Sequence, residues 1–127
     1  MACFLVPATG AIVTKVVTKA VHAKEQASDA AMAQHGVPFS RKLTWLFNLL
    51  AGGSVLLAFE HVWHGEVTPW APYLTAAGNP VDTAEMLHEM ATAGVAMAAL
   101  VALVWLGLLC VCHAVEKKAQ QEQPDAE

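Results

Sequence analysis

Charged side chains are scarce in this sequence, and basic ones are missing from a long central region. Asp, Glu, Lys and Arg make up 14% of the 127 residues whereas 56% are hydrophobic, a balance that excludes an ordinary soluble domain. The seven Lys and Arg residues lie only at positions 15, 19, 24, 41, 42, 117 and 118. So few basic residues also exclude a nucleic-acid-binding surface.

The sequence also lacks the short motifs of soluble enzymes. It contains no nucleotide-binding glycine motif, no nucleophile elbow and no internal repeat. Its three cysteines, Cys3, Cys110 and Cys112, show no CxxC spacing, and the last two would point about 200° apart on a helix. We interpret them as small buried hydrophobic residues. No residue is assigned a catalytic role, and enzyme activity is left open.

Two long apolar runs are what the sequence has in abundance. Residues 90–112 contain no charged side chain, and as a helix they would be about 34 Å long, more than the ~30 Å hydrocarbon core of a bilayer. Residues 43–63, about 31 Å as a helix, carry ionisable groups only near their end, at Glu60 and His61. We predict an all-α integral membrane protein whose residues 36–118 form a hairpin of two transmembrane helices.

The N-terminal segment, residues 1–35, is predicted to form a further helix that is apolar at first and then amphipathic. Its uncharged part, residues 2–14, would reach only about 20 Å as a helix. Because Lys15 can snorkel to the membrane surface, residues 2–21 form either a third span or an interfacial helix. Gly and Pro then break the helix, and Ser40 is the expected N-cap of the next one.

The distribution of basic residues predicts the orientation. Since Lys and Arg flank the hairpin and are absent from its connection, the positive-inside rule places the C-terminus in the cytoplasm and the loop 65–83 outside the membrane. The membrane would be a plasma or bacterial-type inner membrane. Asp82 and Glu85 have the spacing of a capping box at the start of the second span. Residues 119–127 are expected to be a disordered acidic tail.

Ionisable side chains gather where both spans meet this loop. They are Glu60, His61, His64, Glu85, His88 and Glu89. A hairpin brings both clusters to one rim, and carboxylates at a low-dielectric edge without a basic neighbour attract a cation. Imidazole and carboxylate groups are ligands of Zn, Fe and Mn, so we predict a divalent transition-metal site at this rim.

Other interpretations of the rim stay open. Glu60 with the pair Glu85 and His88 is half of a four-helix dimetal carboxylate set, which a homodimer would complete. Haem b is another candidate, with His61 or His64 and His88 as axial ligands. Acids in a first helical turn also stabilise the helix dipole without any further role. The alternative function is a non-catalytic accessory or scaffold subunit that binds a larger membrane protein.

Overall fold

The computed structural model describes residues 2–28 and 36–122, of which 83% are helical. In chain order the elements are α1 (Leu5–Ser28), α2 (Phe39–Trp63), a 3₁₀ turn η1 (Thr75–Gly78), α3 (Pro80–Glu89), a π-helical turn η2 (Met90–Gly94) and α4 (Val95–Gln121). No strand occurs within the described ranges, so the predicted all-α fold is confirmed. Residues 29–35 of the predicted N-terminal segment and 123–127 of the predicted tail lie outside them.

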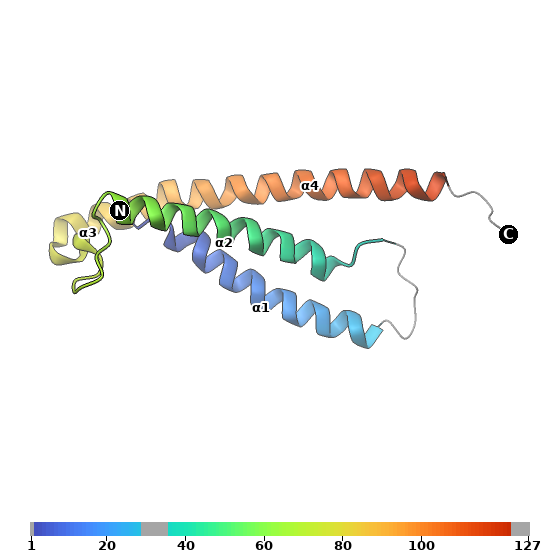
Figure 1. The fold of residues 1–127 in the computed structure, drawn as a ribbon, viewed down its shortest axis with the longest axis horizontal. Helices are drawn as coiled ribbons and strands as arrows, with labels where there is room; N and C mark the ends of the chain where they lie inside the picture. The colour runs from blue at the N-terminus through green and yellow to red at the C-terminus, as the bar shows by residue number, and fades with distance from the viewer. Residues whose placement is uncertain (1, 29–35, 123–127) are drawn as a thin grey trace.

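Helices α1 and α2 form the most extensive contact in the molecule and run antiparallel (Figure 1). The buried residues of α2 recur at steps of three, four and seven, which places them on one face of the helix. They are Ser40, Leu43, Leu50, Ser54 and His61. Helix α1 presents the small residues Ala11 and Thr14 to the interface, which lets the two backbones approach closely.

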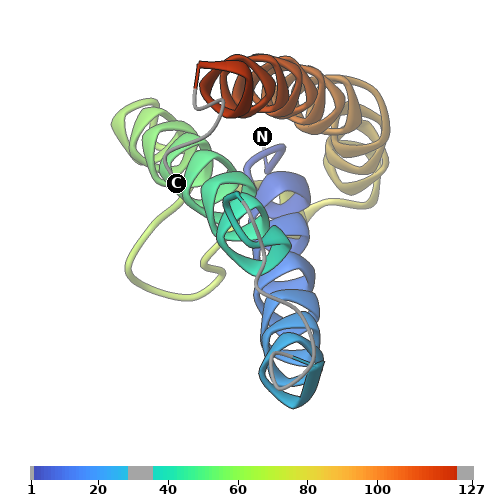
Figure 2. The ribbon, with the colours of Figure 1, turned by 90° about the vertical axis from the view of Figure 1, so that its right-hand side faces the viewer.

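Helices α3 and α4 continue one another through the π turn η2 as a single run of 42 residues, Pro80–Gln121. This run and α2 are the two helices, among the described residues, that are long and apolar enough to cross a membrane, with mean hydropathies of 2.7 and 1.4. None of the described residues of α4 is buried. Helices α1 and α4 are in contact near their starts and diverge toward the end of α1 (Figure 2).

The middle and the end of α4 are joined to the start of α2 by polar contacts. The indole Nε1–H of Trp105 donates a hydrogen bond to the Lys42 carbonyl oxygen at 2.8 Å. One turn after the apolar run 90–112, the Glu116 carboxylate accepts a hydrogen bond from the Val37 N–H at 2.8 Å. The same carboxylate lies 3.6 Å from the Lys42 ammonium. Helices α2 and α4 are thus fastened to each other at the end of the molecule where α2 begins.

Both predicted helix starts differ from the observed ones. Pro38 occupies the N-cap position of α2 and Ser40 lies inside the helix, where its backbone N–H donates to the Glu25 carboxylate of α1. Asn79 caps α3 and its side chain accepts the backbone N–H two residues on, so Asp82 is a first-turn residue rather than the cap. In each case a side chain that precedes the predicted cap accepts a hydrogen bond from a backbone N–H of the first helical turn.

Candidate functional site

His61, in the last turn of α2, is the centre of the polar rim. Its side chain is buried although it is ionisable, with 6% of the residue exposed. Nδ1 lies 2.7 Å from the Leu57 carbonyl oxygen, which can only accept, so Nδ1 carries the hydrogen. A neutral His61 ring therefore keeps a lone pair on Nε2. The Phe4 ring packs edge-on against the imidazole, with centroids 5.5 Å apart, and fixes its orientation.

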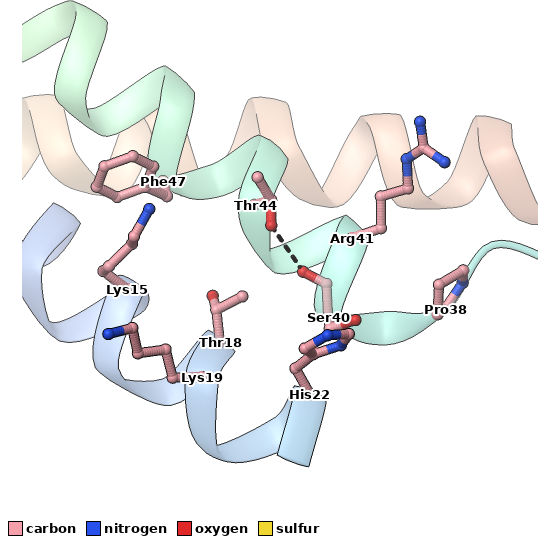
Figure 3. Close-up of a pocket in the computed structure, with 9 residues that line it drawn as sticks. All are labelled: Lys15, Thr18, Lys19, His22, Pro38, Ser40, Arg41, Thr44 and Phe47. Atoms are coloured by element: carbon pink, nitrogen blue, oxygen red, sulfur yellow. Dashed lines mark hydrogen bonds between the residues drawn. The ribbon is translucent and has the colours of Figure 1, made fainter. Parts of the chain in front are cut away.

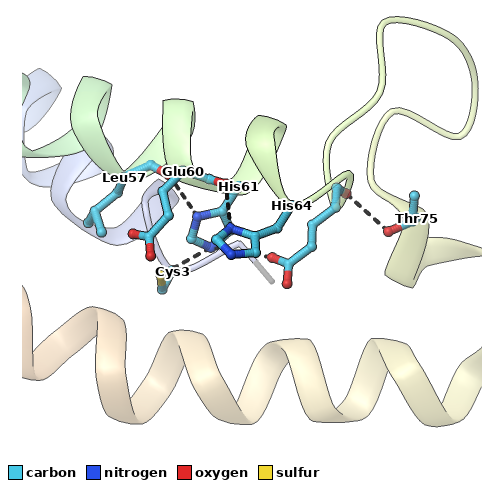
Figure 4. Close-up of polar contacts among 7 residues, drawn as sticks. Cys3, Leu57, Glu60, His61, His64 and Thr75 are labelled. Carbon is cyan, nitrogen blue, oxygen red and sulfur yellow. Dashed lines mark hydrogen bonds and ion pairs between the residues drawn. The ribbon is translucent and has the colours of Figure 1, made fainter.

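Two side chains face this Nε2 atom. The Cys3 thiol donates a hydrogen bond to it, with Sγ at 3.3 Å, and a Glu66 carboxylate oxygen lies 3.8 Å away. Cys3 precedes α1 and is itself buried. Figure 4 shows Cys3 and His61 turned toward each other between α2 and the long helical run Pro80–Gln121. A thiol, an imidazole and a carboxylate thus meet at one end of the molecule.

The chain reversal after α2 is what brings Glu66 to His61. Gly65 adopts a left-handed φ of 73°, and the Glu66 N–H bonds to the His61 carbonyl while the Gly65 N–H bonds to that of Val62. This pair of bonds is a Schellman motif, which favours glycine at the left-handed position. Thr75 then donates both its N–H and its hydroxyl to the Glu66 carbonyl, each at 3.1 Å (Figure 4).

Close backbone packing brings Cys3 to the same place. A Cβ atom added to Gly94 would lie 3.0 Å from the Cys3 carbonyl oxygen and 2.8 Å from Cγ2 of Val6. Glycine therefore permits the chain before α1 to lie directly against the start of the long C-terminal helix. Ala2, the residue before Cys3, is buried in a small apolar cluster with Ala76 and Met86.

These side chains border a cavity of about 310 Å³. It is lined by Cys3, Leu57, Glu60, His61, His64, Glu66 and Met97. Glu60 and His64 are exposed, and the His64 ring donates from Nδ1 to the Glu60 carbonyl oxygen at 2.9 Å. Three of the six residues singled out from the sequence, Glu60, His61 and His64, thus share one cavity.

The other three sequence candidates lie on α3. Glu85 and His88 are exposed and are not among the residues that line the cavity. Glu89 is half-buried and lies within electrostatic range of both His61 and His88. Within the described residues, no three or more His, Cys, Asp and Glu side chains are already arranged to hold a metal ion. Cys3 Sγ and a Glu66 carboxylate oxygen nevertheless lie 3.3 Å and 3.8 Å from His61 Nε2.

Sequence reasoning missed two members of this group. Cys3 was expected to be a buried hydrophobic residue, and it is buried, but its thiol is also hydrogen-bonded to His61 across 58 positions. Glu66 lies in the predicted loop 65–83 and is not among the predicted ligands. No spacing in the sequence links Cys3 to His61. For Glu66 there was a signal, because the glycine before it is the residue that favours a chain reversal.

Comparison with known proteins leaves the function to be argued from this geometry. No family model, curated protein or solved structure matches the chain.

Proposed function

We propose that this chain is a small integral membrane protein that binds a divalent transition metal at the His61 end of its helices. Membrane integration is supported by α2 and by the 42-residue run Pro80–Gln121, whose most apolar window has no residue buried within the molecule. Burial of such a surface in lipid removes it from water. The orientation proposed is the one that the basic residues favour, with the loop 65–83 outside.

The observation that carries the metal proposal is the environment of His61 Nε2. Histidine ligands in metal sites usually donate their other ring N–H to a carbonyl or carboxylate, as His61 does to Leu57. In a tetrahedral zinc site, a thiolate sulfur and an imidazole nitrogen lie about 3.6 Å apart. The separation of 3.3 Å between Cys3 Sγ and His61 Nε2 is close to that value.

The thiol narrows the choice of metal. Thiolate and imidazole ligands together favour Zn over Mn, which prefers oxygen ligands. Glu66 would supply the third ligand after a change of side-chain rotamer, and Glu60 borders the same cavity. Cys3 binds as the thiolate, so metal binding would release a proton. A bis-histidine haem is less well supported, because His88 does not line this cavity.

Metal analysis of the purified full-length protein in detergent tests this proposal. After incubation with Zn²⁺ and removal of excess metal, we expect a stoichiometric ion in the wild type and an affinity at least about tenfold lower in Cys3→Ser and in His61→Ala. Cys110→Ser and His113→Ala are matched controls, because both residues lie on α4 away from the cavity. Co²⁺ substitution adds a thiolate charge-transfer band that Cys3→Ser should abolish.

Two results would contradict the metal site. One is the absence of bound metal in a folded, helical wild-type protein. The other is stoichiometric metal whose affinity is unchanged in both Cys3→Ser and His61→Ala. A Soret band in the protein as isolated would favour haem instead.

A second candidate function is that of an accessory subunit bound to a larger membrane protein or to a second copy of this chain. The unburied length of α4 favours it, because apolar side chains cover the helix all round. Co-purification of a stoichiometric membrane partner under mild detergent, together with no metal, would support this role over the first.

A further inference from the structure

A second and larger cavity lies between α1 and the first turns of α2, toward the opposite end of these helices from His61. Its volume is about 470 Å³. It is lined by Lys15, Thr18, Lys19, His22, Pro38, Ser40, Arg41, Thr44 and Phe47 (Figure 3). None of these residues has a role in the metal site. The cavity therefore needs its own explanation.

The charge of this cavity is of one sign. Lys15, Lys19 and His22 follow one another at steps of four and three on α1, so they share one face of the helix. The Lys15 ammonium lies 4.5 Å from the centre of the Phe47 ring on α2 and is held over the cavity by this cation–π contact. The guanidinium of Arg41 is turned away from the lysines (Figure 3).

No carboxylate is found among the described residues that line the cavity. The neighbouring acid, Glu25, is not among the lining residues, and its carboxylate accepts the Ser40 N–H at 3.1 Å at the start of α2. The side chains of Lys15 and Lys19 thus border a space whose other walls include Phe47 and Pro38. This combination suits an anion that carries an apolar portion.

We propose that this cavity binds the phosphate group of an anionic phospholipid. Basic pockets between membrane helices, at the level of the headgroups, are a recurring form of lipid recognition. Lys15 and Lys19 would contact the phosphate, while the acyl chains lie along Phe47 and the exposed apolar face of α1, which includes Ile12 and Val16. The inference rests on the membrane integration proposed above but not on the metal site.

Equilibrium binding of fluorescent phosphatidylglycerol to the full-length protein in neutral detergent micelles tests this site, with phosphatidylcholine as the reference lipid. We expect the Lys15→Gln, Lys19→Gln double variant to bind phosphatidylglycerol about 30-fold more weakly, since each lysine near a headgroup contributes about a factor of five. The Lys15→Arg, Lys19→Arg variant should retain binding. The Lys117→Gln, Lys118→Gln variant, with the same charge loss on α4, should bind as the wild type does.

Lys15 and Lys19 are both exposed, so the substitutions should leave the fold intact, which a helicity measurement will show. Equal affinity for the two lipids would overturn the proposal, as would equal losses in the α1 and α4 double variants. Binding of inorganic phosphate in place of phosphatidylglycerol would assign the cavity to a soluble anion and overturn the lipid. Recovery of the protein in the soluble fraction after cell lysis would instead defeat membrane integration itself, which separates the two failures.

Discussion

Replacing Gly94 by alanine should release the N-terminal segment from the polar rim. The added Cβ would lie 2.8 Å from Val6 Cγ2 and 3.0 Å from the Cys3 carbonyl oxygen. Carbon atoms pack at about 3.5–4.0 Å, so Val6 would have to move by roughly 0.7 Å or more. Valine has essentially one χ1 rotamer in a helix, and the Cys3 atom belongs to the backbone, so neither neighbour can turn aside.

Overpacking of this kind costs about 1–3 kcal/mol, which lowers the ratio of docked to undocked N-terminal segment by about 5- to 150-fold. Alanine also stabilises a helix relative to glycine by about 0.5–1 kcal/mol, in the opposite direction. Gly107→Ala is the matched control, because it lies in α4 and a Cβ there would meet nothing within 4 Å. The difference between the two variants therefore reports the clash alone.

The assay is the rate at which a maleimide modifies Cys3 in a protein whose other cysteines, Cys110 and Cys112, are replaced by serine. Only 9% of Cys3 is exposed, so its modification requires the chain end to open. We expect the Gly94→Ala protein to react at least about fivefold faster than the Gly107→Ala protein. Equal rates in these two variants would refute the close packing of the N-terminal segment on Gly94.

Three further predictions concern an acid near the end of α1, the orientation of the loop 65–83 and the contact between α4 and α2. The pKa of Glu25 lies below its ordinary value because Ser40 hydrogen-bonds the carboxylate; its stabilising contribution is present above the unfolded pKa and is lost as pH falls through the folded one. Thermal midpoints below pH 5 should therefore fall more steeply in the wild type than in Glu25→Gln, and parallel curves would contradict this. Thr75→Cys, in a cysteine-free background, should react with an impermeant maleimide added outside intact cells; labelling only after the cytoplasmic side is opened would reverse the orientation. Trp105→Phe should lower stability by about 1 kcal/mol through loss of the bond to the Lys42 carbonyl, measured by unfolding in mixed micelles; an unchanged midpoint would count against that contact.

The helices could be predicted from sequence because their signal is local. Uncharged runs long enough to span a bilayer predicted α2 and α4. The Gly and Pro residues before Ser40 predicted the break between α1 and α2. Helix starts were less accurate, since several residue types can meet the first N–H groups. At α2 the Glu25 carboxylate comes from another helix, which no local pattern indicates.

The polar rim could be predicted only in part, because it depends on how distant segments pack and on one irregular turn. His88, Thr92 and Ala96 are spaced four apart in the sequence, so they would share one face of a continuous α-helix. The π turn Met90–Gly94 takes up one extra residue, so the face that carries His88 is rotated by about 100° relative to α4. Gly94, the last residue of that turn, has no side chain, so the backbone of Cys3 can pack directly against it. The thiol from the chain end, rather than the second histidine, thus reaches His61.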